Sequence, residues 1–109
     1  MFRLHLNRII LIGQVTEKPI LRYVPSGNPI CSFSIQVLRE NLNTASADEE
    51  YDVFPVVAWK EQALYCSQSI EKGSWVYGEG ALQIRTFGEA SQKKTTVEVI
   101  LKDIFRLQQ

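Results

Sequence analysis

The chain has 109 residues, which is enough for one domain with a single modest core. Twelve basic and twelve acidic residues give a net charge of zero, which excludes a strongly basic, histone-like binder but not binding through a local groove. An uninterrupted apolar run such as Ile9 to Ile12 is far too short to span a membrane. We therefore expect one soluble, intracellular domain over residues 1–109, with no membrane partner.

Strand-like segments divided by turn signals occupy the first part of the chain. Leu4 to Val15 predicts a long first strand with a bend at Gly13, and a shorter apolar run, Ile20 to Val24, follows. The segment from Pro25 to Asn28 is a strong turn signal. Ile30 to Leu38 predicts the second full strand, because its apolar and polar residues alternate as on a strand with one buried face.

The middle of the chain predicts one helix. A polar loop, Asn41 to Glu50, precedes the third strand, Tyr51 to Trp59. Beyond that strand, apolar residues recur at the spacing of one helix face, and Lys72-Gly73 is a good helix stop. The residues at this spacing are Ala63, Cys66 and Ile70.

The last part of the chain predicts two long strands. Trp75 to Phe87 contains glycines that permit sharp coiling, and a hairpin loop over 88–93 leads into the final strand, Lys94 to Leu107. Five strands with one helix between the third and the fourth predict an all-β, five-stranded OB-fold barrel. A small sandwich is the competing architecture, and the single helix in that position favours the barrel.

Few residues offer catalytic or metal-binding chemistry. Cys31 and Cys66 are the only cysteines and lack C-x-x-C spacing, so we expect two reduced, packed thiols, no metal and no cofactor. His5 is the only histidine and has no adjacent nucleophile, and the chain contains no P-loop. We therefore expect a binding module and not an enzyme.

Two strands carry side chains suited to single-stranded nucleic acid, which is bound through aromatic faces for bases and cations for phosphates. In the strand from Trp75 to Phe87, Arg85 and Phe87 share one face with Gln83, because the side-chain period of a strand is two. Both faces of the strand that ends at Trp59 are apolar, so one face should pack against the core and the other should contact a ligand or another protein. The alternative for Trp59 is that it only caps the core or the helix.

Several stretches resemble the bacterial-type single-stranded DNA-binding protein family, in register along nearly the whole chain. They are Leu6 to Gly13, Leu21 to Gly27, Val56 to Trp59, Lys72 to Gly80 and Thr96 to Val99. The resemblance implies an OB-fold, tetrameric assembly and sequence-tolerant binding of single-stranded DNA in replication, recombination or repair. It also implies that Trp59 and Phe87 stack on bases. Family position places Arg8 and Arg22 near the groove, and strand face adds Arg85 to them.

The sequence departs from the family pattern in three ways, and the missing tail and the acidic loop, together with the net charge of zero, favour a second hypothesis. The chain ends at Gln108-Gln109 without the family's long acidic-tipped tail, two further stacking positions fall at Val53 and about Asn41, and Asp48 to Asp52 is acidic. Acidic residues there would repel a phosphate backbone. The short form resembles tail-less relatives from cyanobacteria and plastids, and also the primosomal accessory protein. The alternative function is therefore an OB-fold protein-interaction module with weak or no DNA affinity, and the preference between DNA and RNA stays open.

The first strand indicates self-association. Its large aliphatic residues fall on both faces, with Leu6, Ile10 and Ile12 on one and Ile9 and Leu11 on the other. This is more aliphatic surface than one barrel interior can cover. We expect a homodimer or homotetramer formed through this strand, located in the bacterial cytoplasm or nucleoid or in an organelle stroma.

Overall fold

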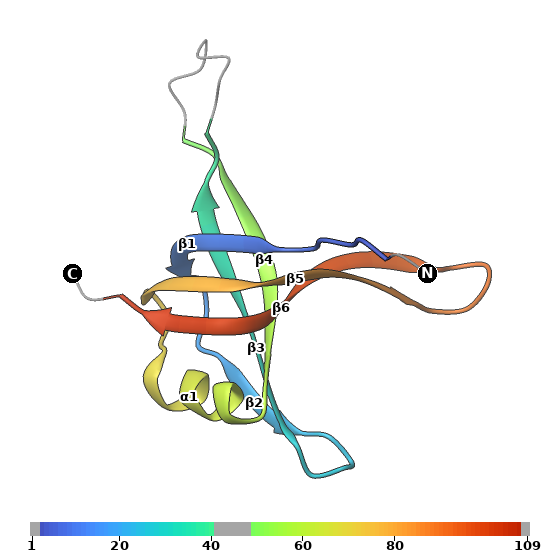
Figure 1. Cartoon of the computed structure of the whole chain (residues 1–109), viewed down its shortest axis with the longest axis horizontal. Helices are drawn as coiled ribbons and strands as arrows, with labels where there is room; N and C mark the ends of the chain where they lie inside the picture. Colours follow the sequence, from blue (N-terminus) through green and yellow to red (C-terminus); the bar gives the residue numbers. More distant parts are fainter. Residues whose placement is uncertain (1–2, 41–48, 108–109) are drawn as a thin grey trace.

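The computed structural model describes residues 3–40 and 49–107 (Figure 1). The elements in chain order are β1 (Ile9–Val15), β2 (Ile20–Tyr23), β3 (Pro29–Leu38), β4 (Tyr51–Trp59), α1 (Glu61–Ser69), β5 (Trp75–Phe87) and β6 (Lys94–Arg106). The helix lies between β4 and β5, as the sequence predicts.

The strands form one sheet that closes on itself. Its order is β1-β5-β6-β4-β3-β2, and β1 also pairs with β3, so five of the strands complete a ring. All pairings in the ring are antiparallel except that of β4 with β6. The sixth strand, β2, extends the sheet beside β3 and corresponds to the short apolar run of the sequence. This ring agrees with the predicted OB-fold barrel.

Two glycines allow strands to approach closely around the ring. A β-carbon at Gly13 would collide with the backbone carbonyl of Gln36 on β3, and one at Gly80 with that of Ile100 on β6. The register between β5 and β6 also shifts between Glu79 and Gly80. A side chain at either glycine would therefore force neighbouring strands apart.

The core fills the ring and extends to the helix. Its strand residues are Leu11, Val15, Cys31, Phe33, Ile35, Val56, Ala58, Val76, Val99, Leu101 and Ile104. The three residues predicted to face the core from the helix, Ala63, Cys66 and Ile70, are all fully buried. Both cysteines are free thiols. Burial raises the pKa of Cys31 and raises that of Cys66 to about 12, so both side chains act as packing groups.

The first strand is shorter than the sequence predicts. It begins at Ile9 instead of Leu4, because its ladder with β5 starts where Ile9 faces Gly80. Before that point, the Asn7 amide donates to the Leu82 carbonyl over 2.7 Å and accepts from the Leu82 N–H over 2.9 Å. The side chain of Asn7 thus occupies the hydrogen-bonding positions that a continued strand would use.

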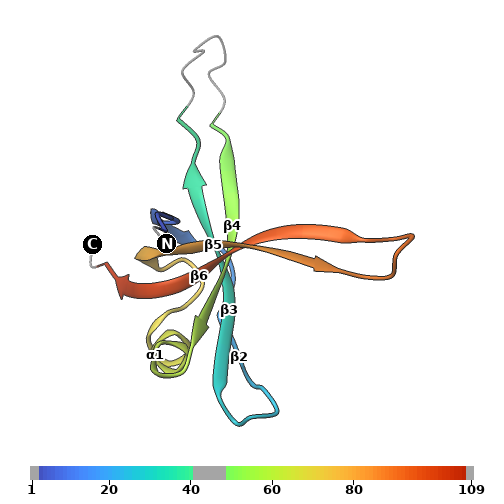
Figure 2. The same ribbon diagram turned by 45° about the vertical axis from the view of Figure 1, so that its right-hand side comes forward.

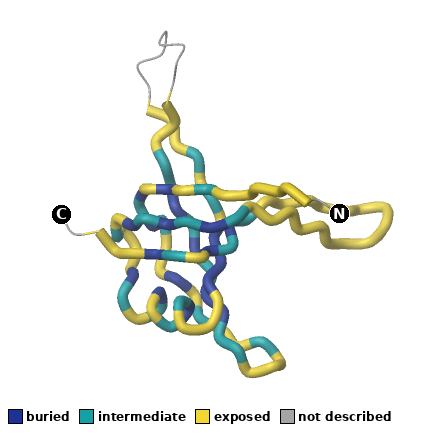
Figure 3. The backbone as a smooth tube through the Cα atoms, in the orientation of Figure 1, coloured by how far each residue is buried: buried dark blue, intermediate teal, exposed yellow. Residues whose placement is uncertain are grey.

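Three hairpins project from the barrel. The β3–β4, β5–β6 and β2–β3 hairpins point in three different directions (Figures 1 and 2). The radius of gyration is 16.0 Å, compared with about 13 Å for a compact domain of this length. The outer part of the β5–β6 hairpin is exposed along its length (Figure 3). These arms make the molecule more extended than a compact domain of its length.

Candidate nucleic-acid interface

A groove of about 380 Å³ lies on the outer surface of the barrel, between the β2–β3 and β5–β6 hairpins. It is lined by Arg22, Val24, Ile30, Ser32, Val57, Trp59, Gln83, Arg85, Glu98 and Ile100. Three of the five predicted contact residues, Trp59, Arg22 and Arg85, therefore share one groove. They come from three strands that are far apart in the sequence.

Strand register explains how these residues come together. Arg22 on β2 is opposite Ile30 on β3, and Ile30 is in turn opposite Trp59 on β4. The parallel pairing of Val57 with Ile100 then joins β4 to β6. Because side chains alternate between the two faces of a strand, this row lies outside the barrel while its sequence neighbours fill the core.

The ring of Trp59 remains accessible. The residue is 39% exposed and lines this groove and, on another side, a second cavity at the start of α1. A tryptophan that only capped the core would be enclosed by its neighbours. Trp59 instead offers aromatic surface at the edge of the groove, where a planar base could stack.

The residue after Trp59 has an unusual backbone conformation. Lys60 has φ 58° and ψ −126°, and it is the one non-glycine residue with positive φ in the described ranges. Its N–H donates to the Pro29 carbonyl over 2.9 Å, and its carbonyl accepts from the Leu64 N–H over 3.2 Å. These two bonds hold the sharp turn from β4 into α1 against the steric cost of positive φ. No pattern in the sequence predicted this turn.

The groove continues toward the loop between β1 and β2. An adjoining cavity of about 330 Å³ shares Ser32, Val57 and Glu98 with the first and adds Lys18 and Glu17. Lys18 extends the cationic rim beyond the two arginines. Sequence reasoning missed it, because it lies in a loop without periodicity.

Glu98 is the acidic residue that the two cavities share. Its side chain is 16% exposed, and one of its oxygens lies 3.9 Å from an Arg85 guanidinium nitrogen. It is directly opposite Gln83 on β5. The alternation of β6, with Val99 and Leu101 buried, would have placed Glu98 on the groove face once the strand register was known.

Phe87 and Arg8 do not line the groove. Phe87 is at the end of β5, opposite Lys94, and is 48% exposed. It shares a strand face with Arg85 but lies farther out on the hairpin. Arg8 lies 2.8 Å from the Glu79 carboxylate, which is 16% exposed and therefore already supplies Arg8 with a counter-charge. The contact roles of both residues stay predictions.

The acidic stretch is partly neutralised within its own hairpin. Arg39 lies 2.8 Å from Glu50 and 2.6 Å from Asp52, and its hydrogen bond lowers the pKa of Asp52. Tyr51 donates to Glu49 over 3.0 Å, which raises the pKa of Tyr51. Asp48 lies outside the described residues. The β3–β4 hairpin projects in a different direction from the β2–β3 and β5–β6 hairpins, which border the groove (Figure 1).

Residues 6–107 match the model of the single-strand binding protein family. The chain belongs to this family. It is 34% identical over 100 residues to the single-stranded DNA-binding protein of Caldanaerobacter subterraneus subsp. tengcongensis, covering 91% of this chain and 66% of that relative. It is 35% identical over 95 residues to single-stranded DNA-binding protein A of Bacillus subtilis, covering 86% and 55%. The chain therefore spans two thirds or less of the length of these relatives.

A solved structure supports the same family and fold. The Plasmodium falciparum SSB in complex with ssDNA superposes with a TM-score of 0.87 and 26% sequence identity, covering 99% of this chain and 100% of that one. The resemblance to the bacterial-type family is thereby confirmed, whereas the narrower cyanobacterial or plastid assignment stays a prediction. No helix in the described ranges is long and apolar enough to cross a membrane.

Proposed function

We propose that this chain binds single-stranded DNA in the groove, with little dependence on sequence, and acts in replication, recombination or repair. The observation that carries the proposal is that Trp59, Arg22 and Arg85 line one groove. Family membership and the names of the relatives support it. The proposed role is binding without catalysis or a cofactor, in the cytoplasm or at the nucleoid.

In the proposed complex, a base stacks on Trp59 while phosphates pass along the basic rim. Arg22 and Arg85 flank the ring, and Lys18 continues the rim in the adjoining cavity. A path along β5 would bring Phe87 to a later base, because it shares the face of Arg85. Stacking accepts every base and phosphate contacts carry no sequence information, so this arrangement favours sequence-tolerant binding. Family membership and the basic, aromatic groove favour DNA binding over the alternative of a protein-interaction module.

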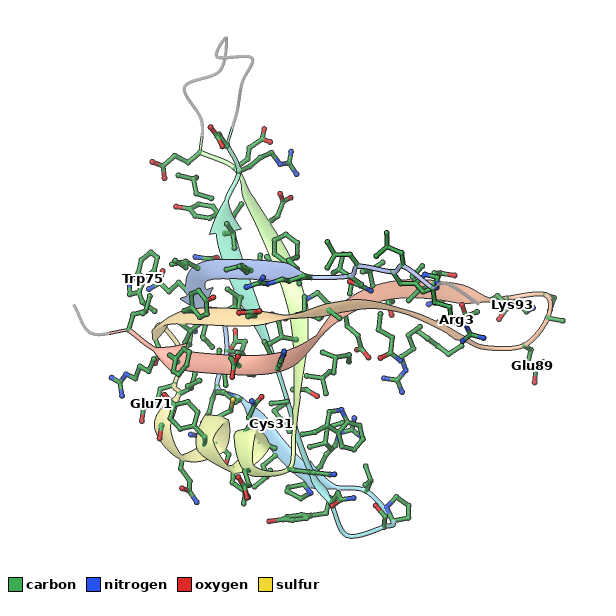
Figure 4. The ribbon with its side chains drawn as sticks, in the orientation of Figure 1. Arg3, Cys31, Glu71, Trp75, Glu89 and Lys93 are labelled. Atoms are coloured by element: carbon green, nitrogen blue, oxygen red, sulfur yellow. The ribbon has the colours of Figure 1, made fainter. Side chains whose placement is uncertain are left out.

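The two tryptophans provide a matched test. Trp59 is 39% exposed in the groove, and Trp75 is 38% exposed at the opposite end of β5 from the hairpin tip marked by Lys93 (Figure 4). Oligo-dT should quench the emission of the Trp75→Phe variant, in which Trp59 is the remaining tryptophan. It should leave the emission of Trp59→Phe largely unchanged.

Two further measurements complete that test: the dependence of affinity on salt, and the comparison of DNA with RNA. Binding should weaken as salt rises, with a slope of about 0.7 per phosphate contacted, and an oligo-rU titration measures the preference for DNA over RNA. If neither oligo-dT nor oligo-rU binds at low salt, the proposed function is wrong and the groove is a protein-docking surface.

We also propose that the chain self-associates through β1. Ile10 and Ile12 are 48% and 56% exposed on the outer face of β1, and Phe105 on β6 is 55% exposed opposite Tyr77. Ile12 is in turn opposite Tyr77, so these side chains form one apolar surface. Leu11 faces the core instead and is 8% exposed.

Because Ile12 faces outward and Leu11 faces the core, substitutions at these two residues distinguish an effect on assembly from an effect on folding. Ile12→Glu should keep the β-sheet signal in circular dichroism but give a smaller particle in light scattering than the unchanged chain. Leu11→Glu should unfold the chain, because it buries an unpaired charge. A monomer for the unchanged chain at micromolar concentration would contradict the proposal.

A further inference from the structure

Glu98 is a carboxylate enclosed in the middle of the proposed DNA path. It lines both stretches of the groove and is 16% exposed, whereas its neighbour Arg85 is 58% exposed. The 3.9 Å separation between the two side chains is longer than a hydrogen bond. Among the hydrogen bonds of residues 3–40 and 49–107 that involve side chains, none is donated to this carboxylate. Its acceptor oxygens are therefore available to a ligand.

A carboxylate at this depth requires the bases to face the floor of the groove. A phosphate near Glu98 would meet like charge, while the exposed cations Arg22, Arg85 and Lys18 lie where a backbone could pass. The floor beside Glu98 is formed by Ser32 and the mostly buried Val57. Bases directed inward would bring their edges, and not their phosphates, to Glu98.

An ionised carboxylate can only accept hydrogen bonds, so it distinguishes bases by the donors they carry. Cytosine presents an exocyclic amino group, and glutamate accepting from it is a known mode of base recognition. Thymine presents one N–H between two carbonyl oxygens, which would be repelled by the carboxylate. The geometry points to Glu98 as a residue that accepts hydrogen bonds from base amino groups and so adds a modest preference for cytosine over thymine to binding that is otherwise tolerant of sequence.

A purely structural role accounts less well for the position of Glu98. A surface ion pair of this length to a side chain as exposed as Arg85 contributes little to stability. Glu98 also faces Gln83 across the strands, and an amide does not neutralise a carboxylate. This inference rests on the proposed function, since it assigns the base chemistry of the same groove.

The test is the ratio of two affinities, measured for oligo-dC and oligo-dT of equal length at one salt concentration. Glu98→Gln is nearly isosteric and should shift this ratio toward oligo-dT by roughly fivefold or more, because the amide can donate as well as accept. Differences in stacking between the two bases are common to both proteins and cancel in the comparison. Glu17→Gln is the matched control, because it also removes one negative charge from the groove and should leave the ratio unchanged.

A modified ligand provides a second measurement that needs no variant. Oligomers of N4,N4-dimethylcytosine lack both amino hydrogens, and the unchanged protein should bind them more weakly than oligo-dC. The inference is overturned if Glu98→Gln and Glu17→Gln alter the ratio equally, or if dimethylation does not weaken binding. Absence of binding to every oligomer would instead show that the proposed function itself is wrong, and the inference with it.

Discussion

Replacing Trp59 by alanine removes the aromatic surface at the edge of the groove. Stacking of one base on an aromatic side chain is worth about 1–3 kcal/mol, so the dissociation constant for oligo-dT should rise by roughly 5- to 150-fold. The groove keeps both of its arginines in this variant, and the slope of affinity against salt should therefore stay the same. Fluorescence anisotropy of a labelled oligo-dT measures both quantities.

Trp59→Ala should lower the free energy of unfolding by less than the replacement of a fully buried tryptophan would. Removing a fully buried ring costs about 3–5 kcal/mol, but Trp59 is 39% exposed and lies between two cavities, so we expect about 1–3 kcal/mol. Urea unfolding measures this loss. Trp59→Phe keeps an aromatic face and should restore most of the affinity.

One combination of results would refute this reasoning. If Trp59→Ala unfolds with the full loss expected of a buried tryptophan while the folded fraction binds oligo-dT normally, Trp59 is a cap of the core. Trp75→Ala provides the comparison, because Trp75 has nearly the same exposure and does not line the groove.

Three further predictions concern stability and thiol chemistry. Lys60→Gly should stabilise the chain by about 1 kcal/mol in urea unfolding, because glycine adopts positive φ without steric cost; a loss of stability would show that Lys60 is not strained. The Arg39–Asp52 pair lowers the pKa of Asp52, so its stabilisation is present above about pH 4 and lost as the pH falls through the lowered value. The melting temperatures of Asp52→Asn and the unchanged chain should therefore converge in acid, and a constant difference would contradict this. Cys31 and Cys66 should resist iodoacetamide in the native protein at neutral pH and react in denaturant, because burial raises both thiol pKa values; rapid native labelling would exclude the buried arrangement.

Much of the fold could be predicted from periodicity. The alternation of β3 and the helical spacing of Ala63, Cys66 and Ile70 both reflect burial, and burial determines those elements. The start of β1 could not be predicted this way. Leu4 and Leu6 continue the apolar pattern, but they are 84% and 91% exposed, because the ladder ends where Asn7 bonds to the β5 backbone.

The groove could be predicted only in part. The alternation of side chains along one strand predicted the face of Arg85. It cannot predict which strands are neighbours, and the pairing between strands is what brings Arg22 and Glu98 to the groove. Arg8 has a suitable charge, yet its ion pair with Glu79 depends on the neighbouring strand. The contacts between strands that are distant in the sequence could therefore not be predicted.

The most direct test of the central claim is to find where single-stranded DNA touches the protein. Oligo-dT carrying 5-iodouracil can be crosslinked by ultraviolet light, which joins the modified base to aromatic side chains in contact with it, and mass spectrometry identifies the peptide. We expect crosslinks to the peptide that contains Trp59, and an excess of unmodified oligo-dT should abolish them. Crosslinks confined to Trp75, which lies outside the groove, or to Phe105, on the proposed self-association surface, would contradict the proposed function.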